Sequence, residues 1–85
     1  MKNEDKLAEI VSGILGTDRR ELVDSRKVGE IPNWDSFNNL QIISAVEEAF
    51  KVSFTTEEII NAVTYGDVKK LLEKHGVKMG EGRTA

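Results

Sequence analysis

The sequence predicts an all-α fold: a four-helix bundle with three longer helices, one short helix and a long first loop. Apolar residues recur at helical spacing in three stretches, and residues typical of helix starts and ends border them. The 85 residues suffice for one small domain. We expect this domain to span residues 1–77 and a disordered tail to follow at residues 78–85.

The first helix is expected to begin at Asn3, a favoured N-cap residue, and to end at Gly16, a residue typical of helix C-termini. Residues 17–34 then lack a sustained helical period, which makes this connection long for a compact domain. We expect a short turn near residues 18–22 and a partly buried ring at Trp34. Three apolar side chains should attach the loop to the core: Val23, Val28 and Ile31.

The longest periodic stretch predicts a second helix from Ser36 or Phe37 to about Phe50. Its apolar positions form a wide stripe, which indicates packing against several neighbours. The stripe consists of Phe37, Leu40, Ile42, Ile43, Ala45, Val46, Ala49 and Phe50. After this helix we expect Val52 and Phe54 to return to the core.

Two capping patterns predict the remaining helices. Thr55 and Glu58 have the spacing of a capping box, which opens the short helix. Thr64 and Asp67 open the last helix, which is expected to end at Gly76. Its apolar face consists of Val68, Leu71 and Leu72.

Ser36 stands where the long loop gives way to the second predicted helix. One interpretation is structural, because a serine oxygen at an N-cap accepts a hydrogen bond from a first-turn N–H group. The other is chemical. The unpaired N–H groups and the positive end of the helix dipole suit a phosphate ester, so the serine hydroxyl could carry a phosphate-linked group.

The sequence around this serine resembles the acyl carrier protein family. In that family an Asp-Ser-Leu triplet opens a helix that ends in Glu-Glu-x-Phe. Here Asp35-Ser36-Phe37 and Glu47-Glu48-Ala49-Phe50 stand at that spacing, and the resemblance covers about residues 5–75. A second Asp-Ser pair, Asp24-Ser25, has no helical period behind it.

The resemblance implies a non-catalytic carrier. A phosphopantetheinyl transferase would attach 4′-phosphopantetheine from coenzyme A to the Ser36 hydroxyl, with Asp35 helping to position metal and coenzyme. The thiol of this arm would hold acyl groups as thioesters for acyl-loading and acyl-accepting enzymes of fatty-acid, polyketide or specialised lipid biosynthesis. The chain contains no cysteine, so any acyl thioester needs a borrowed thiol.

Charge is distributed unevenly along the chain. Residues 35–67 carry one basic and six acidic side chains, whereas residues 68–85 carry five basic and two acidic ones. The acidic block argues against a nucleic-acid partner and favours partners that present Lys and Arg in basic docking patches. We expect both glutamates at the end of the second helix to be solvated. The predicted docking residues are Phe37, Gln41, Glu47 and Glu48.

The first turns of the second helix differ from the commonest fatty-acid carriers. Phe37 replaces the usual leucine, and uncharged side chains stand where acids are common at Asn38, Asn39 and Gln41. A docking face with fewer acids near the arm favours a dedicated carrier of a specialised pathway.

Enzyme and metal motifs are absent from the sequence. It contains no glycine-rich phosphate loop, paired-carboxylate site, nucleophile elbow or metal-ligand spacing, and the lone His75 is assigned no catalytic or metal-binding role. With no apolar run of membrane-spanning length and no signal peptide, the chain is expected to be a cytoplasmic protein, and we expect a monomer.

Two alternatives remain open. One is a peptidyl or aminoacyl carrier, although the Gly-Gly-x-Ser motif usual in such carriers is replaced here by Asn33-Trp34-Asp35-Ser36. The other is an unmodified helical interaction module in which Ser36 serves only as a cap. A DNA-binding helix-turn-helix is disfavoured by the acidic charge.

Overall fold

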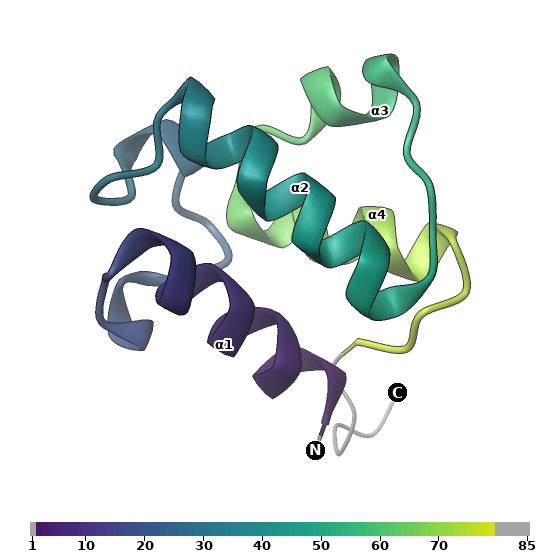
Figure 1. Cartoon of the computed structure of the whole chain (residues 1–85), viewed down its shortest axis with the longest axis horizontal. Helices are drawn as coiled ribbons and strands as arrows, with labels where there is room; N and C mark the ends of the chain where they lie inside the picture. The colour runs from purple at the N-terminus through teal and green to yellow at the C-terminus, as the bar shows by residue number, and fades with distance from the viewer. Residues whose placement is uncertain (1, 80–85) are drawn as a thin grey trace.

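The computed structural model describes residues 2–79 and is all-helical over that range, as the sequence predicts (Figure 1). The four α-helices of this part of the chain include one short one, α3, and the long first loop contains two 3-10 turns. In chain order the elements are α1 (Asn3–Leu15), η1 (Arg19–Glu21), η2 (Val28–Glu30), α2 (Ser36–Phe50), α3 (Thr56–Asn61) and α4 (Tyr65–Lys74).

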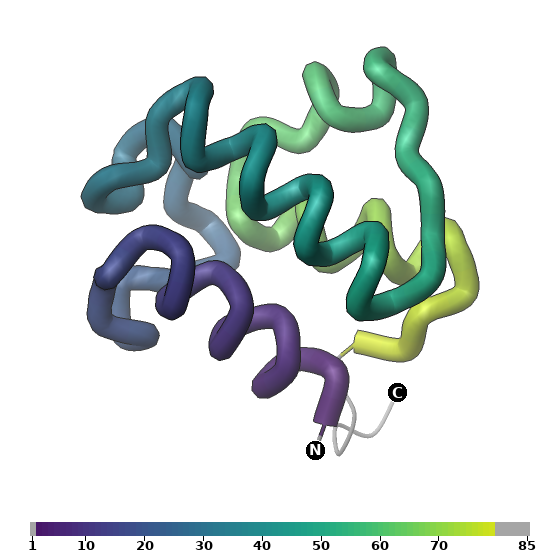
Figure 2. The backbone as a smooth tube through the Cα atoms, viewed as in Figure 1, coloured from purple at the N-terminus to yellow at the C-terminus, as the bar shows by residue number. Residues whose placement is uncertain are grey.

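Apolar side chains of α1, α2 and α4 form the core. Figure 2 shows α1 and α2 running in opposite directions beside each other. The fully buried side chains come from all three helices and from the loop. They are Leu7, Val11, Ile31, Ile42, Val46, Tyr65 and Leu72. Val52 and Phe54 pack against this core, as predicted.

The start of α1 differs from the prediction, whereas its end confirms it. Lys2 occupies the N-cap position, without a side-chain cap, and Asn3 is the first helical residue. The Asn3 amide instead donates to the Lys78 carbonyl at 2.9 Å, which ties the two ends of the described chain together. Gly16 ends the helix with a left-handed φ of 66° and donates its N–H to Ser12.

The long first loop attaches to the core at two of the three predicted positions. Ile31 is buried and Val28 partly buried, but Val23 is 49 % exposed, so the prediction for Val23 is wrong. Its neighbour Leu22 packs inward instead, because successive side chains outside a helix point to different sides of the backbone. The short turn predicted near residues 18–22 is confirmed as η1.

Backbone hydrogen bonds attach this loop to the segment before α4 and to the first residues of α4. Val28 donates to the Val63 carbonyl at 2.9 Å, Tyr65 donates to Arg26 at 3.0 Å, and Gly66 donates to Asp24 at 2.9 Å. Side chains strengthen this junction. Lys69 of α4 binds Asp24 at 2.8 Å and Glu4 of α1 at 2.7 Å, so one ammonium group joins two helices and the loop.

Both predicted capping boxes are confirmed. The Thr55 and Glu58 side chains each accept from the other residue's backbone N–H, at 3.1 Å and 2.9 Å respectively. Thr64 and Asp67 repeat the arrangement at the start of α4, with both distances at 3.1 Å. These bonds satisfy N–H groups that a helix start otherwise leaves unpaired.

The end of the described chain continues the packing past α4. Val77 donates its N–H to Leu72 at 2.9 Å, and Met79 is only 8 % exposed within the core. The prediction that the tail begins at residue 78 is therefore wrong for Met79. This apolar side chain packs into the core although the residues around it in the sequence are mostly polar. The rest of that prediction lies outside the described residues.

Candidate functional site

The start of α2 is capped by Asp35. Its backbone is extended, and its carboxylate accepts the N–H of Asn38 at 2.8 Å. Its carbonyl accepts from Asn39 at 2.8 Å, which closes the first helical turn. Ser36 is therefore the first residue of the helix, and the interpretation of Ser36 as the N-cap is wrong.

The Ser36 side chain is left available by this arrangement. The residue is exposed, and its hydroxyl has no hydrogen-bond partner within residues 2–79. The backbone N–H groups of Ser36 and Phe37 likewise have no acceptor in the same part of the chain. An exposed hydroxyl thus lies beside two unpaired N–H donors at the positive end of a helix, which is a favourable setting for a phosphate group.

Asparagine side chains fasten the loop to this helix start. Asn33 has a left-handed φ of 68°, and its amide donates to the Leu15 carbonyl at the end of α1 at 2.9 Å. The Asn38 amide donates to the Asn33 carbonyl at 2.8 Å. The Trp34 indole N–H donates to the Asn39 side-chain oxygen at 2.9 Å.

The predicted role of Trp34 in closing the loop is confirmed. Its ring is 7 % exposed and meets the Tyr65 ring edge-on, with the centroids 6.5 Å apart. Tyr65, which the sequence interpretation missed, lies at the centre of the core, and burial raises the pKa of its hydroxyl.

A groove of about 410 Å³ lies beside Ser36. It is formed by the loop, the first turn of α2 and the short helix α3, three segments that sequence spacing did not bring together. Its lining consists of Val28, Gly29, Trp34, Asp35, Ser36, Asn39, Ile59 and Ala62. The wall opposite the helix start is therefore mainly apolar.

A second groove, of about 510 Å³, lies between α1 and the outer side of α2. Phe37 and Leu40 border it and are 70 % and 67 % exposed, so the prediction that the whole apolar stripe packs against neighbours is wrong for these two. The buried residues of the stripe are Ile42, Ile43 and Val46, and Phe50 packs partly buried against the same core. The remaining lining consists of Ile14, Gln41, Ser44, Ala45 and Glu48. Three of the four predicted docking residues thus share one surface.

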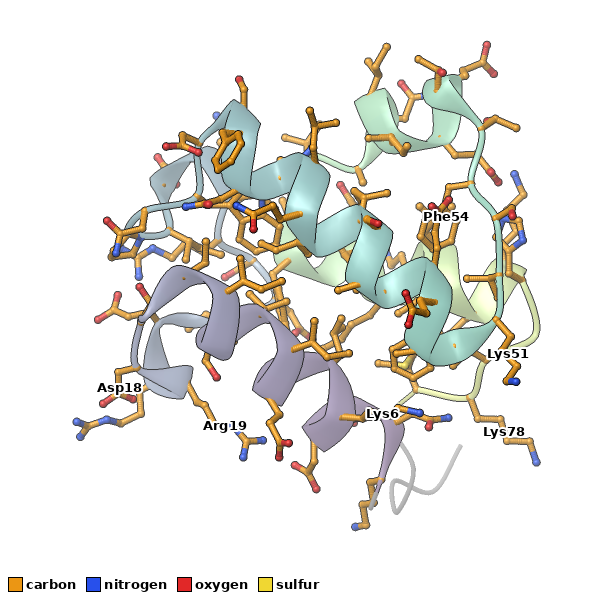
Figure 3. The ribbon with its side chains drawn as sticks, viewed as in Figure 1. Lys6, Asp18, Arg19, Lys51, Phe54 and Lys78 are labelled. Atoms are coloured by element: carbon orange, nitrogen blue, oxygen red, sulfur yellow. The ribbon has the colours of Figure 1, made fainter. Side chains whose placement is uncertain are left out.

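Glu47 does not belong to that surface. Its carboxylate accepts the backbone N–H of Phe54 at 2.8 Å and is partly buried, whereas Glu48 is exposed. Phe54 lies on the segment that connects α2 to α3 (Figure 3). The prediction that both glutamates are solvated is therefore wrong for Glu47, because adjacent helical residues point about 100° apart. On the same end of α2, Lys6 donates to the Ala49 carbonyl at 3.1 Å, with its ammonium group over the Phe50 ring.

Glu58 joins α3 to α4. Besides the Thr55 N–H, its carboxylate meets Lys74 at 3.1 Å and the His75 ring nitrogen at 3.1 Å. The bond from the Thr55 N–H, followed by that from Lys74, lowers the pKa of Glu58 to about 2. The cap could be predicted from the sequence, but the pairing with His75 could not, since no local spacing links Glu58 to a residue at the end of α4.

Within residues 2–79 no group of three or more His, Cys, Asp or Glu side chains could hold a metal ion. No helix in that range has the length and apolar character needed to cross a membrane. No known protein-family model matches the chain.

Proposed function

We propose that the protein is an acyl carrier whose Ser36 hydroxyl receives a 4′-phosphopantetheine arm. The observation that supports the proposal is that Asp35, not Ser36, caps α2. The Ser36 hydroxyl is therefore exposed and, within residues 2–79, without a hydrogen-bond partner. It lies beside the backbone N–H groups of Ser36 and Phe37, which have no acceptor in that range either. The resemblance of the Asp35-Ser36-Phe37 region to acyl carriers gives the chemical identity of the arm.

The transfer needs little from the carrier itself. The Ser36 oxygen attacks the phosphorus of coenzyme A that bears pantetheine, the bond to the nucleotide phosphate breaks, and the serine proton passes to a base of the transferase. One carboxylate oxygen of Asp35 holds the cap, while the other accepts no hydrogen bond within residues 2–79 and is available to the metal of the transferase. The arm then supplies the thiol that the chain lacks.

The two grooves serve different steps in this proposal. The groove beside Ser36 offers the arm and its acyl group an apolar wall at Val28, Ile59 and Ala62. The groove between α1 and α2 receives partner enzymes, with Phe37 and Leu40 as apolar contacts and Glu48 as the acidic one. A partner that presents Lys or Arg opposite Glu48 complements this surface.

The test is the addition of the arm. Wild-type protein, incubated with coenzyme A, magnesium and a broad-specificity phosphopantetheinyl transferase, should gain one arm by intact-protein mass spectrometry. Ser36→Ala should gain none. Ser25→Ala is the matched control, because Ser25 also follows an aspartate and is exposed but does not open a helix, and it should be modified like wild type.

A second candidate function is an unmodified interaction module, which the exposure of Phe37 and Leu40 favours. Modification that persists in Ser36→Ala, or folded wild type that several transferases leave unmodified, would remove the carrier proposal. The second outcome leaves the interaction module as the function to pursue.

A further inference from the structure

We propose that Asn38 and Asn39 are positioning residues that hold the loop against the first turn of α2 and so fix the Ser36 hydroxyl for transfer. This inference rests on the proposed function. The two asparagines neither cap the helix nor touch the hydroxyl. They act through Asn33 and Trp34, the residues that precede the Asp35-Ser36 pair.

Asn39 anchors the helix start to the core through Trp34. A buried indole N–H without an acceptor is costly, and the Asn39 oxygen at 2.9 Å supplies that acceptor. Since the Trp34 ring is itself packed against Tyr65, this bond fixes the first turn of α2 relative to α4.

Asn38 anchors the same turn to α1 through Asn33. Its amide donates to the Asn33 carbonyl at 2.8 Å, and its oxygen accepts from Gln41 at 3.0 Å. Asn33 in turn donates to Leu15. Asparagine adopts a left-handed φ more readily than other residues with a side chain, and the hydrogen bonds of Asn33 to α1 and α2 hold it in that conformation.

The side-chain chemistry explains why residue 38 is an amide. An ionised aspartate would be an acceptor only and could not donate to the Asn33 carbonyl. An amide also adds no negative charge where the phosphate of the coenzyme must approach. The departure from acidic residues at this point therefore fits bracing of the loop. At residue 39 only an acceptor for the Trp34 N–H is required, so an aspartate there should preserve the hydrogen bond.

The consequence for Ser36 is pre-organisation. The residues on either side of it, 33–35 and 38–39, are held by hydrogen bonds, so little conformational freedom has to be lost when a transferase aligns the hydroxyl with the coenzyme. We call the hydrogen bonds of Asn38 to Asn33 and of Asn39 to Trp34 the brace. Loss of either bond should lower kcat more than it raises KM, because the docking groove between α1 and α2 is left intact.

The test uses Trp34, the only tryptophan, as a built-in probe. Acrylamide quenching of its fluorescence and the kinetics of arm transfer are measured for Asn39→Ala, Asn39→Asp and Asn38→Asp. Asn61→Ala is the control, since Asn61 is an exposed asparagine at the end of α3. Thermal melts establish that each variant is folded at the assay temperature.

Asn39→Ala should be quenched about twice as strongly as wild type and should lose about tenfold in kcat, a fraction of what misplacement of a reacting group can cost. Asn38→Asp should lose kcat similarly. Asn39→Asp should restore both readouts to within about twofold of wild type, and Asn61→Ala should match wild type. If Asn39→Ala does not fold, Asn38→Asp at the surface carries the test.

Two results overturn the inference. Wild-type kcat in both Asn39→Ala and Asn38→Asp would show that the brace does not position Ser36, whatever the quenching. Wild-type quenching in a folded Asn39→Ala would show that the indole bond does not hold the loop. If no transferase modifies wild type at all, the proposed function and the positioning role of the two asparagines fall together. If Ser36→Ala gains no arm but the asparagine variants react as fast as wild type, only the positioning role falls.

Discussion

At the residue scale, a shift of one position decides how Ser36 can be used. Aspartate and serine are about equally good N-caps, so the sequence Asp35-Ser36 does not tell which of them caps α2. The backbone decides it, because Asp35 is extended and its carboxylate reaches the N–H of Asn38. A capping serine would have had its oxygen occupied, whereas here the hydroxyl is exposed and accepts nothing within residues 2–79.

Gly66 is a single residue on which the loop junction depends. A Cβ atom there would lie 2.9 Å from the Asp24 carbonyl oxygen, which also accepts the Gly66 N–H. Gly66→Ala must therefore shift one of the two segments, which strains their hydrogen bond. We expect a loss of about 1–3 kcal/mol in the free energy of unfolding, measured by urea denaturation.

Gly13 provides the matched control for this substitution. It lies in α1, and a Cβ there would meet nothing within 4 Å. Gly13→Ala should stabilise the protein by up to about 1 kcal/mol, because alanine favours the helix more than glycine does. Gly66→Ala with the stability of wild type would contradict the close contact between the loop and α4.

At the scale of elements, most of the fold could be predicted because each helix has local signals. The capping boxes at Thr55 and Thr64 and the stop at Gly16 depend only on neighbours in the sequence, and all three are confirmed. What could not be predicted depends on tertiary partners. A wide apolar stripe does not say which part of it will be covered, so the exposure of Leu40 was not predicted, and Phe37 was expected both in the stripe and on the docking face.

The candidate site divides in the same way. Asp35 and Ser36 could be found from a motif, whereas the grooves could not, because one needs α3 and the other α1 to complete it. From the sequence, Asn38 and Asn39 differ from the commonest carriers only in lacking charge. Their hydrogen bonds to Asn33 and Trp34 depend on the left-handed backbone at Asn33, which could not be predicted from the sequence.

The pairing of α3 with α4 at Glu58 predicts how acid affects stability. Glu58 has a pKa of about 2 in the folded protein against an ordinary value of 4.5, chiefly because of the Thr55 N–H and Lys74. Its contribution is complete above the ordinary value and is lost as pH falls from about 4.5 towards 2. Wild type should therefore lose stability over this range, as followed by urea midpoints at several pH values.

Glu58→Gln isolates this group from the other carboxylates. Glutamine can keep the capping bond to the Thr55 N–H but does not ionise. The variant should be less stable than wild type at neutral pH, and the difference between the two should shrink as pH falls towards 2. A difference that is constant with pH would mean that the Glu58 carboxylate does not ionise differently in the folded protein.

At the scale of the whole molecule, the fold separates charges that look alike in the sequence. Part of the basic C-terminal charge is paired, since Lys69 binds Glu4 and Asp24, and Lys74 binds Glu58. Glu47 and Glu48 are likewise unequal, because only Glu48 lines the groove between α1 and α2. The acidic charge available to a partner on the groove between α1 and α2 is therefore smaller than the acidic block suggests, and Glu48, which carries it, lies about 18 Å along α2 from Ser36.

This inequality allows docking to be separated from stability with two matched substitutions. Glu48→Lys should slow association with a phosphopantetheinyl transferase that presents a basic surface, by stopped-flow measurement, and added salt should shrink the effect. Its free energy of unfolding should stay within about 0.5 kcal/mol of wild type.

Glu47→Lys is the matched control. It makes the same change of charge but also removes the acceptor of the Phe54 N–H, so it should lower the free energy of unfolding by about 1–3 kcal/mol. If Glu48→Lys associates at the wild-type rate in low salt, recognition depends on the apolar contacts of Phe37 and Leu40 rather than on charge.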